Sequence, residues 1–531
     1  MQADLVLFNG LIHTMDREQP LVEAIAAHCG RIIAVGDSDD VRALTGPSTE
    51  HIDLHGRLVV PGFTDAHIHL VNYGLSLERV QLDGVTSLEE AVGRVAERAC
   101  ITQQGEWVLG WGWNRNLWPG APFPSKDDLN PVTPDNPVFL KSKDGHAAWV
   151  NSQALEIAGI SAATPNPPGG VYERNPETGE LTGVLKENPA IDIMIKAAGP
   201  APLTERMRAI KAAQERLHRY GVVGVHVPEE EHEFAALQRA WLEGHLKLRV
   251  SFMIADKHLD GVLRMGLRPG FGDDFLRLSN VKAYADGSLG SRTADMLAPY
   301  KGQVGNRGVE VSSSEYLSDL VSRCATRGWS PAIHAIGDRA NHRVLHALEE
   351  HWQEWSRRDL RPRVEHAQLL APQDVARLGT MGVIASMQPM HCTSDLLMAE
   401  RYWGSRCSGA FAWRSLLECG TVLAFGSDAP VEEPSVLRGI FAAVTRQRED
   451  GTPAGGWYPE QCLSVPEAIY AYTVGAAYAS GEEHIKGSLR VGKQADMVVL
   501  SKNIFELPPQ EILNTRVETT ILAGEIVYRL A

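Results

Sequence analysis

The stretch Val59–Leu70, VVPGFTDAHIHL, is a buried apolar run that ends in two histidines spaced two residues apart. It predicts a β-strand that delivers His67 and His69 to one side, because side chains at i and i+2 of a strand point the same way. Asp65 lies at the same parity. Imidazoles that converge beside a carboxylate suit a divalent transition metal. The alternative is an ordinary strand with two incidental histidines, so the rest of the chain must decide.

Composition and charge exclude several classes of partner. The 531 residues are 44% hydrophobic and 22% charged, which is typical of a globular protein with several domains. The formal net charge is −15 and no basic cluster interrupts it, so nucleic acid and membrane surfaces are not expected partners. No apolar run approaches the roughly 20 residues of a membrane span, and MQADLVLFNG lacks the basic start of a signal peptide. Seven scattered cysteines without a Cys-x-x-Cys pair favour reduced thiols in the cytoplasm.

Both ends of the chain alternate short apolar runs with turns, which predicts one small β-sandwich built from the two termini. The runs include ADLVLFNG and GRIIAVGD within residues 1–60, and ADMVVLS and TTILAGEIVYRL within residues 484–531. Residues 61–483 are then the main domain.

Within the main domain, about residues 73–200 lack regular periodicity and are rich in Trp, Pro and Asn. We expect this stretch to be an insertion after the first strand that covers a site. Trp111 and Trp113, with Trp118 and Trp149, are candidates to line a substrate pocket. The alternative is that they pack the core of the insertion itself.

From residue 203 onward a unit of helix, glycine stop and apolar strand recurs. With the opening stretch this makes eight strands separated by helical segments, which predicts an α/β fold of the (β/α)8 barrel type, similar to the TIM barrel. The later seven strands are predicted in VVGVHVPE (222–229), KLRVSFMIA (247–255), LSNVKAYADG (278–287), WSPAIHAIG (329–337), PRVEHAQLL (362–370), VIASMQP (383–389) and TVLAFGSDAP (421–430).

Polar residues collect near the C-terminal ends of these strands, where such a barrel carries its active site. An imidazole or charge at the end of an apolar run is costly without a partner. Each one has its own structural explanation, as a core histidine, a paired lysine or an aspartate that caps a turn, but their coincidence on the appropriate strands favours a shared site. The residues, in strand order, are His67, His69, Lys282, His334, His366 and Asp428.

Taken together, these motifs resemble the amidohydrolase superfamily and, within it, amidohydrolase family 3, which contains N-substituted formamide deformylase. The resemblance covers nearly the whole chain. It rests on LFNGLIHTMD, PGFTDAHIH, DGHAAWVNSQAL, VKAYADGSLGSRTA, HAIGDRAN, VEHAQL, SMQPMHCTSD, AFGSDAPVEEP and GSLRVGKQADMVVL.

The resemblance implies two divalent metal ions, with Zn2+ as the expected metal. The two histidines of the first strand and Asp428 would hold one ion, and His334 with His366 the other. Lys282 would bridge them as a carbamate formed with CO2. An ammonium has three donors and no acceptor, so the lysine needs this modification to act as a ligand.

The expected reaction is hydrolysis of an amide-type C–N bond, in an N-substituted formamide or another N-acyl compound, by a metal-bound hydroxide. Metal ions lower the pKa of bound water toward about 7, and Asp428 would take its proton and return it to the leaving nitrogen. Asp65 and Glu365 are candidates to orient ligating imidazoles, with strand-end hydrogen bonding as the alternative.

The resemblance also suggests substrate contacts. His146, Arg292 and His391 follow family-like stretches and are candidates to reach a small-molecule substrate, with structural roles as the alternative. A homodimer is the commonest default for the assembly.

Other functions stay open at this stage. Deaminases of the mononuclear branch carry His-x-x-Glu at the fifth strand and no bridging lysine, whereas this chain reads His334-Ala-Ile-Gly337 and has Lys282. An esterase or lactonase uses the same hydroxide on a different carbonyl. A non-catalytic scaffold should have lost ligands, and this chain retains all six.

Overall fold

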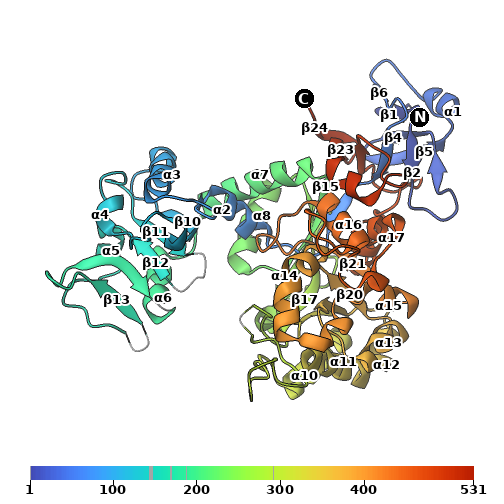
Figure 1. Cartoon of the computed structure of the whole chain (residues 1–531). Helices are drawn as coiled ribbons and strands as arrows, with labels where there is room; N and C mark the ends of the chain where they lie inside the picture. The colour runs from blue at the N-terminus through green and yellow to red at the C-terminus, as the bar shows by residue number, and fades with distance from the viewer. Residues whose placement is uncertain (1, 143–146, 168–169, 187, 291) are drawn as a thin grey trace. The chain divides into compact units, whose positions relative to one another are not determined.

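The computed structural model describes residues 2–142, 147–167, 170–186, 188–290 and 292–531 (Figure 1). The chain divides into two compact units. The first unit combines Met1–Gly74 with Ile210–Ala531, and the second unit is Leu75–Ala209. Across the described residues, no helix is both long enough and apolar enough to cross a membrane.

The first unit contains a nearly closed barrel of eight parallel strands, which confirms the predicted fold class. Neighbouring strands pair in chain order, and the two edge strands approach where Ala66 N donates to Phe425 O at 2.9 Å. The strands are buried and mostly apolar because helices cover the outside of a parallel barrel while side chains fill its inside. They are β8 (Phe63–Asp65), β15 (Val222–Val227), β16 (Arg249–Ala255), β17 (Leu276–Tyr284), β18 (Ser330–Ala335), β19 (Arg363–His366), β20 (Ile384–Met387) and β21 (Leu423–Phe425).

Helices connect the barrel strands, and two of them have a left-handed glycine as the C-terminal cap, as the recurring pattern predicts. One of them, α10 (Ser314–Arg327), is capped by the Ser313 hydroxyl and stops at Gly328, whose φ of 78° suits a residue without a Cβ. The other helices of this part are α8 (Glu231–Leu242), η2 (Asp256–His258), α9 (Leu259–Arg264), α11 (Asp338–Glu350), α12 (Trp352–Ser356), α13 (Pro372–Met381), α14 (Pro389–Tyr402), η3 (Gly404–Gly409), α15 (Trp413–Glu418), α16 (Val436–Thr445), η4 (Pro459–Gln461), α17 (Val465–Tyr472) and α18 (Val474–Ala479).

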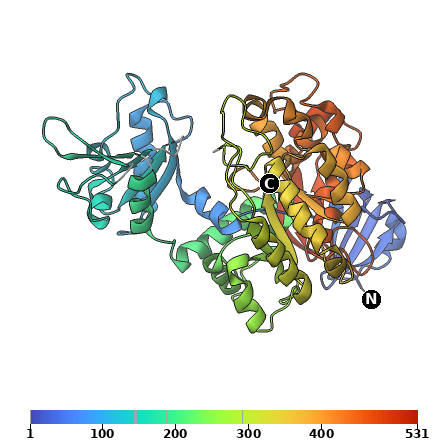
Figure 2. The ribbon, with the colours of Figure 1, turned by 90° about the horizontal axis from the view of Figure 1, so that it is seen from below.

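Two further sheets of the first unit come from the chain ends. Figure 2 shows the N-terminal sheet in dark blue, with its strands side by side. Leu5 and Ile25 of this sheet pack with Val59, Met497 and Ile521 of the other sheet in one hydrophobic core. In pairing order the N-terminal sheet contains β5 (Arg31–Gly36), β4 (Ala24–His28), β1 (Leu5–Phe8) and β6 (Glu50–Asp53). The other sheet contains β24 (Glu525–Arg529), β23 (Val517–Leu522), β22 (Met497–Leu500), β7 (Leu58–Pro61), β2 (Leu11–His13) and β3 (Leu21–Val22). The same parts of the chain also form α1 (Ser38–Arg42) and η5 (Pro509–Asn514).

The second unit folds around its own six-stranded mixed sheet (Figure 1). The chain reaches it through α2 (Leu70–Glu78) and leaves it through α7 (Leu203–Arg219). The sequence shows little strand periodicity here because the strands are short and alternate irregularly with short helices and turns. In pairing order they are β13 (Val171–Arg174), β14 (Leu181–Lys186), β12 (Ala147–Val150), β11 (Val138–Ser142), β10 (Val108–Trp113) and β9 (Val80–Gln81), with α3 (Leu88–Ile101), η1 (Arg115–Leu117), α4 (Lys126–Leu129), α5 (Ser152–Ile157) and α6 (Asn188–Ala198).

A buried ion pair joins the barrel to the C-terminal strands. Arg249 of β16 donates from Nε and Nη2 to the two carboxylate oxygens of Asp496, at 2.6 and 2.8 Å, and from Nη2 to Gln494 Oε1 at 3.0 Å. A buried pair of this kind is tolerated only when its charges are matched and hydrogen-bonded.

Removing one partner of this pair should destabilise the fold. We expect Arg249→Met to lower the free energy of unfolding by about 3–5 kcal/mol, because it leaves the Asp496 carboxylate buried and unpaired. Urea denaturation measures the change. Arg57→Met, which removes the partly exposed pair with Glu518, is the control and should cost at most about 1 kcal/mol. Equal effects would contradict the importance of burial.

The free energy of unfolding should also decrease as the pH falls, because of a buried histidine in α7. His218 bonds through Nε2 to Lys247 O at 2.7 Å, and burial lowers its pKa from 6.5 to about 4. Below pH 6.5 the unfolded chain takes up a proton there that the folded chain does not accept until about pH 4. The wild type should therefore lose roughly 3 kcal/mol more stability than His218→Gln between these pH values.

Urea denaturation across that pH range tests the linkage. His245→Gln is the matched control, because the His245 side chain is exposed and its loss should leave the pH profile unchanged. Parallel profiles for the wild type and His218→Gln would show that His218 does not contribute.

Candidate metal centre

Side chains that are far apart in the sequence meet at the C-terminal ends of the barrel strands. The ring of His366, at the end of β19, lies 5.0 Å from that of His67 and 4.5 Å from that of His334, measured between ring centroids. His69 lies 5.9 Å from His67 by the same measure. Asp428 follows β21, and its Oδ1 lies 3.3 Å from His69 Nε2 and 3.7 Å from His67 Nε2. Four imidazoles and a carboxylate thus form one cluster.

The expectation that His67 and His69 lie on the first strand is wrong, because β8 ends at Asp65. The two histidines lie in the following loop, just before α2 begins. Backbone bonds to neighbouring segments hold this loop: Ile68 N donates to His226 O at 3.0 Å, and His69 N donates to Ala429 O at 2.9 Å. Hydrogen bonds to neighbouring segments of the barrel therefore position the two imidazoles. The alternation of side chains along a strand does not.

Asp65 fixes the backbone beneath the cluster instead of orienting an imidazole. Its Oδ1 accepts from His67 N at 3.1 Å and from Ser427 N at 3.0 Å, which ties the loop after β8 to the loop after β21. Burial raises the pKa of Asp65 to about 7. The two loops pass so closely that a Cβ on Gly426 would lie 2.5 Å from His67 N, so only glycine fits there.

Glu365 orients an imidazole, as its sequence position predicts. Its Oε2 lies 2.5 Å from His67 Nδ1, and Arg363 Nε donates to its Oε1 at 2.8 Å. Although burial opposes ionisation, the Arg363 guanidinium and His67 hold the pKa of Glu365 well below its usual value. A carboxylate can only accept a hydrogen bond, so His67 Nδ1 carries the proton. The lone pair of Nε2 is then free to bind a metal ion.

Two more imidazoles are fixed through one ring nitrogen. His366 Nδ1 lies 2.8 Å from Gln388 Oε1, and His334 Nε2 lies 3.0 Å from Gly287 O. Both contacts are to acceptors, so the other nitrogen of each ring is unprotonated. Burial lowers the pKa of His334 to about 3 and that of His366 well below its usual value. Neutral imidazoles are the form that binds metals.

The environment of the Lys282 amine shows whether this cluster suits a metal. Its side chain is 3% exposed, and among the described residues its Nζ has no hydrogen-bond partner. Burial lowers its pKa from 10.5 to about 8. A buried ammonium without a partner is costly. Neutral imidazoles, a carboxylate and an unpartnered amine therefore fit divalent metal ions.

His391 lies closer to this cluster than a substrate contact alone requires. It is on α14, its ring stacks 6.2 Å from that of His366, and its Nε2 lies 3.9 Å from Asp428 Oδ2. His366, His391 and Asp428 each offer a ligand atom within 4.8 Å of the others. The same holds for His67, His69 and Asp428.

Arg292, Trp111 and Trp113 are the other predicted substrate contacts that the structure describes. Arg292 is exposed, with its guanidinium 5.6 Å from the centre of the Tyr402 ring. His146 lies outside the described residues. Trp113 is buried, donates to Leu140 O at 3.0 Å and packs against Trp118 in the core of the second unit, and its substrate role stays a prediction. Trp111 is 37% exposed, and its substrate role stays a prediction.

Sequence reasoning missed Glu229, at the end of the second predicted strand. Its buried carboxylate accepts from Val71 N at 3.0 Å and from Asn72 N at 2.9 Å, in the first turn of the helix that follows His69. It also missed Arg363, which reaches Ala66 O and Ser386 Oγ beneath the cluster. The available signal was a charged residue inside an apolar strand, which is costly unless it is paired.

A nearly closed (β/α)8 barrel with imidazoles, a carboxylate and a buried lysine at its strand ends defines a metal-dependent hydrolase. The chain belongs to the amidohydrolase family, whose model matches residues 50–528.

Relatives span nearly the whole chain. This chain is 34% identical to the protein LONG AFTER FAR-RED 3 of Arabidopsis thaliana, over 99% of this chain and 92% of the Arabidopsis protein. It is 28% identical to N-substituted formamide deformylase of Arthrobacter pascens, over 99% and 98%. The crystal structure of an uncharacterized metal-dependent hydrolase from Pyrococcus furiosus superposes with a TM-score of 0.79 at 29% identity, over 94% of this chain and 100% of that chain.

Loss of the Glu365 carboxylate should weaken metal binding. We expect Glu365→Gln to lower affinity for Zn2+ by about 10–100-fold, because the amide no longer fixes the protonation and orientation of His67. Competition with a chelator, followed by metal analysis, measures the affinity. Glu511→Gln, at an exposed pair with Lys502, is the control. Unchanged affinity in Glu365→Gln would exclude an orienting role.

Proposed function

We propose that this protein hydrolyses the C–N bond of a small amide-type substrate, an N-substituted formamide or another N-acyl compound. The observation that carries the proposal is the buried Nζ of Lys282, which has no hydrogen-bond partner among the described residues and lies 4.8 Å from the centre of the Tyr284 ring. Similarity over nearly full length to an N-substituted formamide deformylase supports the choice of bond. The alternative that the barrel is only a scaffold does not explain why the costly buried amine is retained.

The residues of the cluster would hold two divalent ions, with Zn2+ as the expected metal. Zinc accepts imidazole nitrogen and carboxylate oxygen. Lys282, carbamylated by CO2, would become a bidentate anion that bridges the two ions. The remaining ligands would be His67, His69 and Asp428 for one ion, and His334 and His366 for the other. When bound, the ions supply a Lewis acid for the substrate carbonyl and a nucleophile drawn from water at neutral pH.

Asp428 would move the proton of the attacking water. Its Oδ1 lies 3.3 Å from His69 Nε2, whereas its Oδ2 lies 3.9 Å from His391 Nε2. We therefore assign proton transfer to Oδ2, which takes the proton from water and returns it to the leaving nitrogen. The backbone bond from Asp428 N to His67 O, at 2.7 Å, fixes the carboxylate relative to the histidines.

His391 is proposed to bind the substrate. Its Nε2 has no hydrogen-bond partner among the described residues, although the side chain is buried. An imidazole nitrogen left free beside Asp428 is available to the polar group of a bound acyl compound. Arg292, in the loop after β17, is a more distant candidate for substrate contact.

Replacing Asp428 tests the mechanism. We expect Asp428→Asn to lower kcat by about 10²–10⁴-fold, because the amide cannot accept the proton. Turnover of N-substituted formamides by Zn2+-loaded enzyme is the measurement, and rates are compared per bound metal ion because Asp428 is also a proposed ligand.

Two controls make this test decisive. Asp450→Asn, at an exposed aspartate that bonds only within its own turn, should leave turnover unchanged. Formate esters matched to the formamides separate amidase from esterase activity. Full turnover by Asp428→Asn would contradict the mechanism, and hydrolysis of the esters alone would contradict the C–N assignment.

A further inference from the structure

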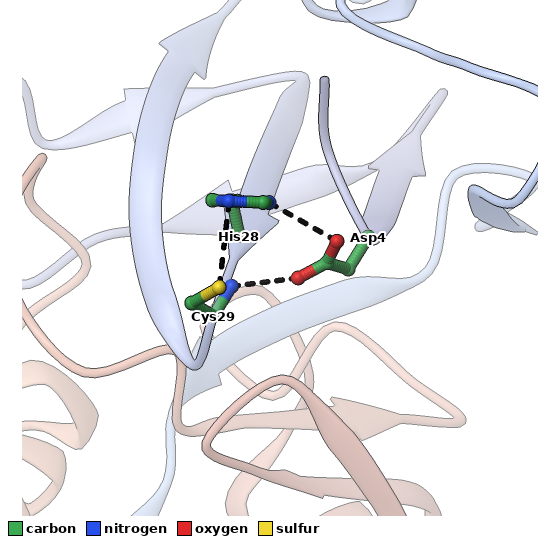
Figure 3. A group of neighbouring side chains, drawn as sticks. All are labelled: Asp4, His28 and Cys29. Carbon is green, nitrogen blue, oxygen red and sulfur yellow. Dashed lines mark hydrogen bonds and ion pairs between the residues drawn. The ribbon is translucent and has the colours of Figure 1, made fainter. Parts of the chain in front are cut away.

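Outside the metal centre, an aspartate, a histidine and a cysteine form a line of contacts on the N-terminal sheet (Figure 3). Asp4 directly precedes β1, His28 is the last residue of β4, and Cys29 begins the turn that follows. Asp4 Oδ1 lies 3.0 Å from His28 Nδ1, and His28 Nε2 lies 3.4 Å from Cys29 Sγ. The order is carboxylate, imidazole, thiol.

The carboxylate determines how the imidazole faces the thiol. The hydrogen bond from the Cys29 amide to Asp4 Oδ2, at 2.6 Å, lowers the pKa of Asp4 and keeps it ionised. An ionised carboxylate only accepts, so His28 Nδ1 must carry a proton and donate it. In the neutral ring Nε2 is then an acceptor, and it faces the thiol. A nucleophile, a base within reach and a third group that orients the base are the parts of an activated nucleophile.

The turn presents the thiol to solvent. His28 pairs with Arg31 across a two-residue hairpin, and both Cys29 and Gly30 have positive φ, at 48° and 76°. Asn, Asp or Gly usually occupies the first of these positions, so a cysteine there adopts an uncommon conformation. The Cys29 side chain is exposed. Access to solvent, a neighbouring base and an anion behind that base are the conditions for a reactive cysteine.

A bound metal ion is a weaker explanation for this cluster. The three residues do offer ligand atoms within 4.8 Å of one another. However, both oxygens of Asp4 are already engaged, one by His28 and the other by the Cys29 amide. A metal that used the carboxylate would compete with these bonds for the lone pairs of the two oxygens, whereas proton transfer from the thiol to the imidazole uses the contacts as they are.

We propose that Cys29 is an activated thiol and a modification site that reacts with low-molecular-weight disulfides. His28 Nε2 takes the thiol proton, and the Cys29 sulfur attacks one sulfur of the small disulfide. A new S–S bond forms as the old one breaks, and the leaving thiolate takes the proton back from His28. The product is one mixed disulfide on the protein and one free small thiol, with no net oxidation.

The other cysteines supply an internal comparison. All seven are free thiols. Cys100 and Cys419 are also exposed, but in the part of the chain that the structure describes neither has a histidine within hydrogen-bond distance. Burial raises the pKa of Cys324 and of Cys392 to about 12, which keeps them unreactive in the folded protein.

The test is the reaction of the native, metal-loaded enzyme with dithiobis(nitrobenzoate), a small disulfide whose released thiol is coloured. At neutral pH a free cysteine is only a few per cent thiolate. A base that removes the proton should therefore speed the reaction of Cys29 about tenfold or more over Cys100 and Cys419. We expect one fast thiol per chain, which Cys29→Ser removes and which Cys100→Ser and Cys419→Ser leave in place.

Two conservative variants test the line of contacts. Asp4→Asn and His28→Gln should slow the fast phase about tenfold without reducing the number of thiols that react. In denaturant the wild type and both variants should react at the same rate, since the effect depends on folded geometry. Slow reaction of the buried cysteines in native protein shows that each variant is folded.

Three results would overturn the proposal. One is a Cys29 that reacts no faster than Cys100 and Cys419. Another is a fast phase that persists unchanged in both Asp4→Asn and His28→Gln. The third is a metal ion that is bound by the wild type and lost only in Cys29→Ser, which would make the cluster a metal site.

Discussion

The metal centre depends on the buried contact between Arg363, Glu365 and His67. A guanidinium and a carboxylate without access to water are tolerable inside a barrel only if their charges are matched and their hydrogen bonds are satisfied. Arg363 meets this condition by donating to Glu365, Ala66 O and Ser386 Oγ. The result is a fixed anion that accepts a hydrogen bond from His67 Nδ1, which keeps the proton on Nδ1 and leaves Nε2 as a ligand. The same guanidinium also anchors the loop that carries the histidine.

Burial then sets the charge state of the rest of the centre. It disfavours the charged forms of imidazole and lysine, so the pKa values of His334 and His366 fall, and that of Lys282 falls to about 8. The imidazoles are thereby kept in the neutral form that can bind a cation. The carboxylate of Asp428 stays ionised because the surrounding imidazoles hold its pKa well below the usual value, although burial opposes this.

In both the Glu365–His67 pair and the Asp4–His28 pair a carboxylate holds an imidazole through Nδ1, and burial decides what each of these two pairs can do. Glu365 and His67 are buried at the C-terminal ends of the barrel strands, where the second ring nitrogen of His67 is near the other proposed metal ligands. Asp4 and His28 are at the surface of the N-terminal sheet, where the free nitrogen faces an exposed thiol. One arrangement suits a metal and the other suits the removal of a proton.

The sequence by itself determined the barrel strands and the residues that end them, because buried parallel strands are continuous apolar runs and a polar residue at the end of such a run needs a partner. It could not place the end of β8, the core packing of Trp113 or the approach of His391 to Asp428. The tertiary structure decided these, because they depend on segments that meet only when the barrel closes. His67 and Glu365, for example, are 298 positions apart in the chain yet in direct contact.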